Sequence, residues 1–205
     1  MTAAGRPTSR RPGPRGAGDA RAAIHEAAAR LFANRGYAGT TLRAVADAAG
    51  VDVALVPYYF GSKSGLFAAV AEMPANPVEI VREVLDEGLD GAGRRIVRAF
   101  LGVWEHPDMG AALQSLFRAS VADPVRAQTL GQFLDTDILS RYRAAAGGPH
   151  ADLRAALAAN MLIGLAVSRY ILHVNPEASM TVDEVVDLVG PVLQDILTGG
   201  PLLAR

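Results

Sequence analysis

The stretch Thr40–Phe60, TTLRAVADAAGVDVALVPYYF, decides the fold of the N-terminal part of the chain. Its spacing predicts two short helices, the first capped by Thr40 and the second by Asp52 and ending at Phe60. Gly50 allows the positive φ of a tight turn, and the small Ala46 permits a close helix crossing. The two helices together predict a helix-turn-helix, whose second helix enters the major groove of DNA. The residues spaced to form its mini-core are Val45, Ala49, Val51, Val56, Tyr59 and Phe60.

The segments on either side extend this unit into a DNA-binding domain over residues 19–73. An amphipathic helix precedes it, with Asp19 as its expected N-cap and Gly36 as its C-terminal stop. Ser62 is expected to cap a further helix that fades near Met73. An inert three-helix bundle is the alternative, but all of these signals in register favour DNA binding.

Pro57 sets the third helix apart from a regular one. With Asp52 as N-cap, the Pro57 ring would oppose the carbonyl of Val53, at a cost of about 3 kcal/mol in a helix interior. The sequence therefore predicts a short or 3₁₀-like start. The residues at the reading end are apolar, so selection of a sequence would depend on thymine methyls, on Arg43 or on DNA shape.

Charge is divided unevenly along the chain. The net charge is −1, yet residues 1–63 carry nine basic and four acidic side chains, a net +5 that leaves −6 for the remainder. This asymmetry indicates a polyanionic partner for one end. Residues 1–18 are predicted to form a disordered basic arm, either solvated or reaching the adjacent minor groove through Arg10, Arg11 and Arg15.

Composition also narrows the class of protein. The chain has no cysteine, which excludes disulfides and thiolate metal sites, and no apolar signal segment follows the N-terminal arginines. The longest apolar stretch, residues 155–167, is expected to be too short for a membrane span. Neither catalytic nor phosphate-binding motifs appear, and the four histidines lack metal-ligand spacing. We therefore expect a cytoplasmic protein that is not an enzyme and has no cofactor or metal.

Residues 74–205 are predicted to form an all-α ligand-binding and dimerisation domain, which brings the chain to nine or ten helices. The longest helix, residues 150–174, is apolar around most of its circumference, and Thr181 or Met180 precedes a last helix that stops at Gly199. A helix apolar on all sides is buried on all sides. Periodicity leaves open whether this burial lies within one subunit or between two.

Several motifs resemble the N-terminal domain of TetR-type transcriptional regulators, densely over about residues 21–72. The remainder resembles that family only in architecture, and its acidic character is similar to that of many actinobacterial members. The motifs are Leu31-Phe32, Arg35-Gly36-Tyr37, Thr40-Thr41-Leu42-Arg43, Val45-Ala46, Ala49-Gly50-Val51, Tyr58-Tyr59-Phe60 and Ser62-Lys63.

The resemblance implies a ligand-responsive regulator, more often a repressor, that binds a double-stranded operator as a homodimer through its last two helices. Phosphate contacts are implied for the threonines at the second helix, for one tyrosine hydroxyl and for Lys63, whose alternative is a solvated surface position. The residues expected to contact DNA are Thr40, Thr41, Arg43, Val53, Ala54, Leu55, Tyr58, Tyr59 and Lys63.

The resemblance also implies a cavity in the middle helices for an apolar or amphipathic small molecule. Ordinary core packing is the alternative for each residue taken singly, and a helical small-molecule-binding protein that no longer regulates DNA is the alternative function. The candidate lining residues are Phe100, Trp104, Met109, Leu113, Gln114, Phe117, Arg118, Phe133, Asn160, Met161 and His173.

Overall fold

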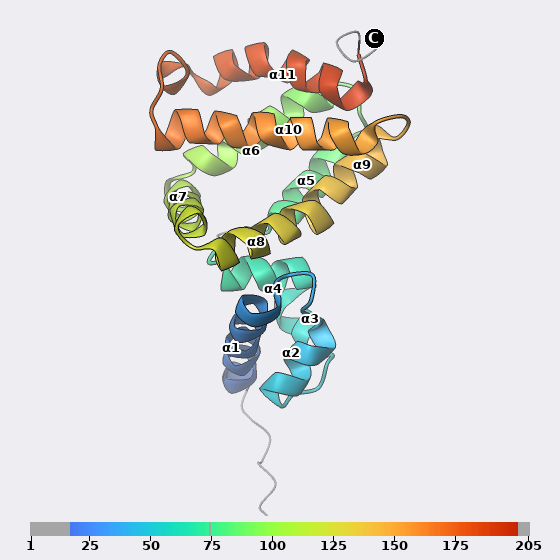
Figure 1. The fold of residues 1–205 in the computed structure, drawn as a ribbon, viewed down its shortest axis with the longest axis vertical. Helices are drawn as coiled ribbons and strands as arrows, with labels where there is room; N and C mark the ends of the chain where they lie inside the picture. Colours follow the sequence, from blue (N-terminus) through green and yellow to red (C-terminus); the bar gives the residue numbers. More distant parts are fainter. Residues whose placement is uncertain (1–16, 74, 201–205) are drawn as a thin grey trace, which may run out of the picture.

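The computed structural model describes residues 17–73 and 75–200, and most of the predicted basic arm lies outside them. Within the described residues the chain forms ten continuous helical runs, one 3₁₀ turn and no strand. A small head of four helices stands at one end, and a larger helical body rises from it (Figure 1). The predicted all-α fold of nine or ten helices is confirmed.

The head comprises α1 (Ala17–Arg35), α2 (Leu42–Ala49), α3 (Leu55–Phe60) and α4 (Lys63–Val70). The N-cap prediction for Asp19 is wrong, because α1 already begins at Ala17 and places Asp19 in its first turn. The glycine predictions are confirmed, since Gly36 and Gly50 both have φ of 67° where α1 and α2 end.

The start of α2 corrects a second prediction. Its N-cap is Thr41, whose hydroxyl accepts a hydrogen bond from the Ala44 amide at 3.1 Å. Thr40 is instead 1% exposed, and its hydroxyl donates to the Gly36 carbonyl at 2.8 Å. Two adjacent threonines look equivalent in the sequence, but the tight loop that follows α1 buries the first.

The predicted irregular start of α3 is confirmed. The amides of Leu55 and Val56 bond to carbonyls three residues earlier, a 3₁₀ pattern, and the Asp52 carboxylate accepts from the Ala54 amide at 2.8 Å. Regular helix begins only at Leu55, with Ala54 rather than the predicted Asp52 as its N-cap, so Pro57 falls in the first turn. Amides in the first turn of a helix have no carbonyl partner within the helix, so proline costs no hydrogen bond there. This removes the cost of about 3 kcal/mol expected for a proline in a helix interior.

The lower body consists of α5 to α9. Asn76, His106 and Asp123 each cap a helix that begins with proline. Helix α6 starts at Ala92, and its first turn is held from outside by α11. The ranges are α5 Pro77–Asp86, α6 Ala92–Glu105, α7 Pro107–Ala122, α8 Pro124–Phe133, a π-helical segment Leu134–Leu139 and α9 Ser140–Ala146.

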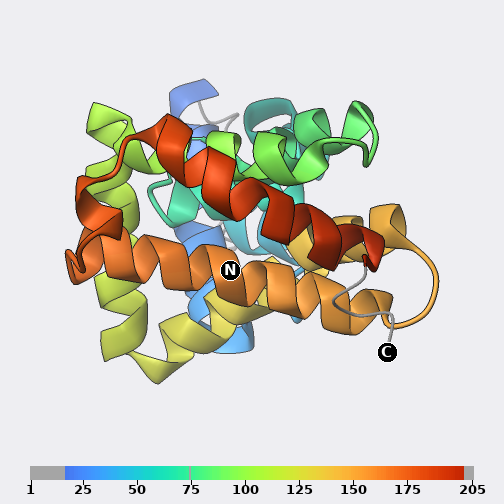
Figure 2. The same cartoon turned by 90° about the horizontal axis from the view of Figure 1, so that it is seen from above.

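Two long helices cover the end of the body opposite the head (Figures 1 and 2). They are α10 (Ala151–Ala166), extended by a π-helical segment to Ile171, and α11 (Val182–Thr198), which follows a 3₁₀ turn at Glu177–Ser179. Thr181 and Glu184 form a capping box at the start of α11, as one of the two predicted starts implies.

The run Ala151–Ile171 corrects the length estimate made for this segment. The π-helical extension makes it 21 residues long, so by length and composition it could cross a membrane. Only about a third of its most apolar stretch is buried within the chain. Helices in the core of a soluble protein can be equally long and apolar. A partner chain over the exposed side of this helix would complete its burial.

Candidate nucleic-acid interface and effector cavity

Helices α2 and α3 lie next to each other and beside α1 in the head (Figure 1). We call the surface formed by α2, α3 and the turn between them the tip of the head. Arg43 and Ala54 are exposed, Val53 is about two-fifths exposed, and Tyr58 is 78% exposed. Leu55 lies half-buried against the head core and offers only part of its surface. The structure thus brings most of the predicted DNA contacts to one end of the molecule.

Thr41 and Thr40 differ in what they can offer a phosphate. Thr41 is exposed at the N-terminus of α2, where free backbone amides and the helix dipole favour an anion. The predicted contact through the Thr40 hydroxyl is wrong, because that group is buried and already donates to Gly36.

Lys63, the only lysine in the chain, lies half-buried at the start of α4. Its ammonium sits 4.3 Å from the centroid of the Tyr37 ring, a cation–π contact. Burial lowers the pKa of Lys63, while the nearby Asp137 carboxylate opposes that shift. Lys63 therefore faces both the head surface and the body.

Tyr37 joins the head to the body. Its hydroxyl donates to the Asp137 carboxylate at 2.5 Å, and the neighbouring Ala38 amide donates to the Gln132 side chain at 3.0 Å. Burial raises the pKa of Tyr37 above its usual range, and the bond to Asp137 raises it further, so the hydroxyl stays a donor. The sequence did not indicate this link, since its partners are about 100 residues apart.

An aromatic cluster crosses the same junction. The Tyr37 ring lies 5.3 Å from that of Phe133 on α8, and Phe67 on α4 lies 4.8 Å from Phe133. Phe32 on α1 packs against both Tyr37 and Phe67. A side chain from the body is therefore part of the core of the head.

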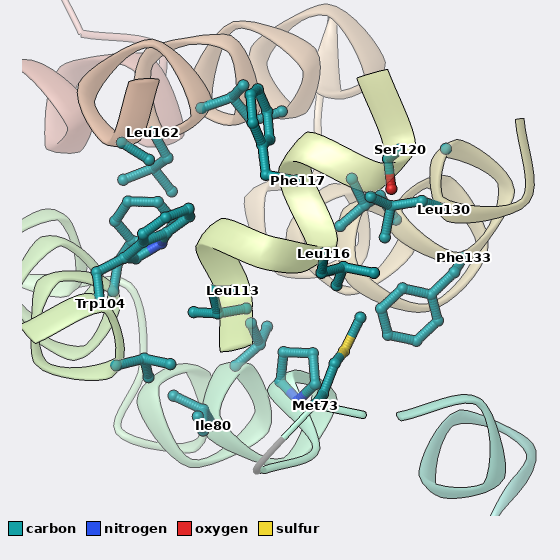
Figure 3. Close-up of a pocket in the computed structure, with 18 of the residues that line it drawn as sticks. Met73, Ile80, Trp104, Leu113, Leu116, Phe117, Ser120, Leu130, Phe133 and Leu162 are labelled. Carbon is teal, nitrogen blue, oxygen red and sulfur yellow. The ribbon is translucent and has the colours of Figure 1, made fainter. Parts of the chain in front are cut away.

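Phe133 also forms part of the wall of a cavity of about 420 Å³ that is bordered by α5 to α10. This volume lies within the range of small-molecule sites. Trp104, Leu113, Leu116 and Phe117 surround the cavity together with residues of the lower helices (Figure 3). Five predicted lining residues are present: Phe100, Trp104, Leu113, Phe117 and Phe133.

The polar lining predictions are wrong. Gln114 and Arg118 bond to each other on the outer side of α7, and Asn160 and His173 are exposed. Two apolar predictions fail as well, since Met109 and Met161 do not reach the cavity. Helical spacing identifies residues that share a face, but the rotation of each helix against its neighbours decides which face turns inward.

Other lining residues were missed by the sequence reasoning. Helix α5 contributes four side chains, and its apolar stripe was the signal that could have pointed to them. Ser120 on α7 gave no signal, because an isolated serine carries no pattern. The missed residues include Met73, Pro77, Ile80, Val81, Val84, Leu116, Ser120, Leu130, Tyr142 and Leu162.

We expect the Tyr37–Asp137 bond to contribute measurably to stability. Tyr37→Phe keeps the ring cluster but leaves the carboxylate without its donor, which should lower the free energy of unfolding by about 2 kcal/mol. Urea unfolding of Tyr37→Phe, Asp137→Ala and the double variant measures the interaction. Additive effects of the two substitutions would contradict the bond.

Comparison with known proteins agrees with this architecture. The family model for the tetracyclin repressor-like C-terminal domain matches residues 90–197, and the model for bacterial regulatory proteins of the tetR family matches residues 24–70. A TetR-family regulator from Streptomyces coelicolor A3 is 34% identical, with 93% of this chain and 99% of that chain covered and a TM-score of 0.46.

Two curated relatives come from Mycobacterium tuberculosis. An HTH-type transcriptional repressor is 36% identical over 100 residues, 46% of this chain and 53% of its own length. The regulatory protein RaaS is 48% identical over 59 residues, 29% of this chain and 27% of its own. The chain thus spans about half the length of the first relative. Both relatives are named as transcriptional regulators and neither as an enzyme. With both of its halves matched by TetR models, the chain belongs to the TetR family of bacterial transcriptional regulators.

Proposed function

We propose that the protein is a homodimeric, ligand-responsive repressor that a small organic molecule releases from its operator. The observation that carries the proposal is the position of Phe133, which forms part of the cavity wall and of the head core at once. A molecule in the cavity acts on this residue without crossing any other layer. The name of the mycobacterial relative supports repression rather than activation.

Binding of double-stranded DNA is assigned to the tip of the head. In this proposal Thr41, Tyr58, Tyr59 and Lys63 contact phosphates, while Arg43 reaches a phosphate or a base edge. The apolar pair Val53 and Ala54 can contact thymine methyl groups. Residues 19–73 act as the DNA-binding domain, and residues 74–205 act as the ligand-binding and dimerisation domain. As a regulator that binds DNA, the protein works in the cytoplasm.

The homodimer is assigned to α10 and α11. These helices lie side by side on the face turned away from the head (Figure 2) and present exposed apolar side chains. Gly164 on α10 has no atom within 4 Å of the position of a Cβ, so a partner helix can approach closely. The exposed apolar residues on the two helices that do not line the cavity are Leu153, Leu188 and Val192.

Release follows from differential binding. A ligand shifts the balance between two conformations only if it binds one of them better. Filling the cavity against Phe133 displaces the aromatic cluster and the Tyr37 link, which changes the placement of the head on the body. In a dimer this changes the separation of the two heads and hence the operator affinity.

The test is selection of a bound site from a random duplex DNA library. A dimer with two heads should enrich an inverted repeat with half-sites about one helical turn apart. Enrichment of no sequence, together with small-molecule binding, would instead indicate a binding protein that does not regulate DNA.

We expect Arg43→Ala to weaken binding of the selected duplex and to reduce its salt dependence. Loss of one phosphate contact lowers the slope of log affinity against log salt by about 0.9 per subunit. Fluorescence anisotropy at several salt concentrations measures both effects. Arg82→Ala, an exposed position on α5 in the body, is the matched control and should leave the slope unchanged. An unchanged slope for Arg43→Ala would assign that residue a contact to a base or none.

A further inference from the structure

We infer that the effector is an electrically neutral, mainly apolar molecule with one hydrogen-bonding group, and that Ser120 holds this group. The inference rests on the proposed function and defines the class of ligand for the same cavity. It follows from two features of the described residues: the cavity lining carries no charge, and one buried hydroxyl in it has no partner.

The lining excludes a charged ligand. No acidic or basic side chain is among the described residues that line the cavity, and Arg118 is exposed on the outside of α7. An ion moved from water into such surroundings without a partner loses far more solvation than apolar contacts return. A neutral molecule with one polar group loses only the hydrogen bonds of that group to water, which a single partner can replace.

Ser120 supplies the polar contact. It is 5% exposed, and its hydroxyl makes no hydrogen bond to any other described residue. A buried hydroxyl left unpaired costs about 1–3 kcal/mol. A serine in a helix usually satisfies its hydroxyl on a carbonyl one turn earlier, so this free group can both donate to and accept from a ligand.

The position of Ser120 connects the ligand to the head. Ser120, Leu116 and Leu130 line the cavity and also a second hollow of about 350 Å³, which α1 and α4 of the head border from the other side. Figure 3 shows the Ser120 oxygen close to Leu130 at this wall. A ligand group on Ser120 is therefore separated from the head only by this shared wall.

Three probes of one chain length test the inference: 1-octanol, octane and octanoate. Trp104 lines the cavity and is the only tryptophan, so its fluorescence reports binding to the full-length protein. We expect octanoate to bind at least tenfold more weakly than 1-octanol. Ser120→Ala should weaken 1-octanol binding about three- to tenfold and leave octane binding unchanged.

The control is Ser115→Ala, an exposed serine on the same helix, which should change neither affinity. Ser120→Ala should also leave the urea midpoint equal or higher, because it removes an unpaired buried group; a purely structural serine would lower it. Octanoate binding as tight as that of 1-octanol, equal losses for alcohol and alkane in Ser120→Ala, or no response of Trp104 to any probe would overturn the inference.

The same titrations performed with the selected duplex separate this inference from the proposed function. If 1-octanol binds with the expected pattern but leaves the DNA affinity unchanged, the class of ligand stands and ligand-controlled release fails. If 1-octanol releases the DNA equally well from the wild type and from Ser120→Ala, release stands and the role of Ser120 fails.

Discussion

Leu188→Glu should convert the dimer into monomers and lower operator affinity by at least about a hundredfold. Leu188 is 64% exposed on α11, on the face assigned to the partner subunit. A carboxylate buried there without a partner costs several kcal/mol, and two-fold symmetry introduces it twice. A monomer then holds only one half-site.

Analytical ultracentrifugation measures the assembly state, and anisotropy with the selected duplex measures affinity. Ala111→Glu is the matched control, because Ala111 is exposed on α7, away from α10 and α11, and lines neither hollow. It should leave both readings unchanged in the absence of ligand. A dimer that persists in Leu188→Glu would contradict the assignment of this face.

Gly93→Ala should lower the free energy of unfolding by about 3 kcal/mol and the melting temperature by about 10 °C. A Cβ at Gly93 would lie 2.2 Å from the Gly190 carbonyl oxygen and 2.5 Å from the Gln194 amide nitrogen, both backbone atoms of α11. Helices α6 and α11 would have to move apart. This movement would also disturb the helical layer that supports the cavity.

Gly102→Ala is the control for this prediction. Gly102 lies exposed on the same helix, and a Cβ there meets nothing within 4 Å. Alanine should therefore stabilise the protein by about 0.5–1 kcal/mol through its higher helix propensity. Thermal unfolding of the two variants compares them directly, and equal changes in stability would show that the close crossing at Gly93 has no effect of its own.

Local signals predicted the helix-turn-helix well. Gly50, Ser62 and Pro57 act on groups within a few residues of themselves, so their consequences can be read without the fold. The start of α6 could not be predicted in this way. There the Gly93 amide donates to the Gln194 side chain, which also donates to the Leu89 carbonyl, so a residue about 100 positions away holds the turn.

The cavity shows the same limit. The family resemblance implied a cavity lined by Phe100, Trp104 and Phe117. Gln114 and Arg118 were expected in the same lining, but they turn outward. The distribution of polar and apolar side chains around a helix is set by its own sequence. Its rotation against neighbouring helices, set by side-chain packing over the whole body, decides what a ligand would meet.

By itself the sequence determined the four-helix head, its turn glycines, the Ser62 cap, the irregular start of α3 and the helical nature of the body. These features depend on backbone hydrogen bonds and apolar spacing within single turns. Only the tertiary structure decided that Thr40 is buried, that Tyr37 bonds to Asp137, and that Phe133 and Ser120 lie on walls shared with the head. Each of these contacts joins segments distant along the chain, and their meeting is set by the packing of all the helices together.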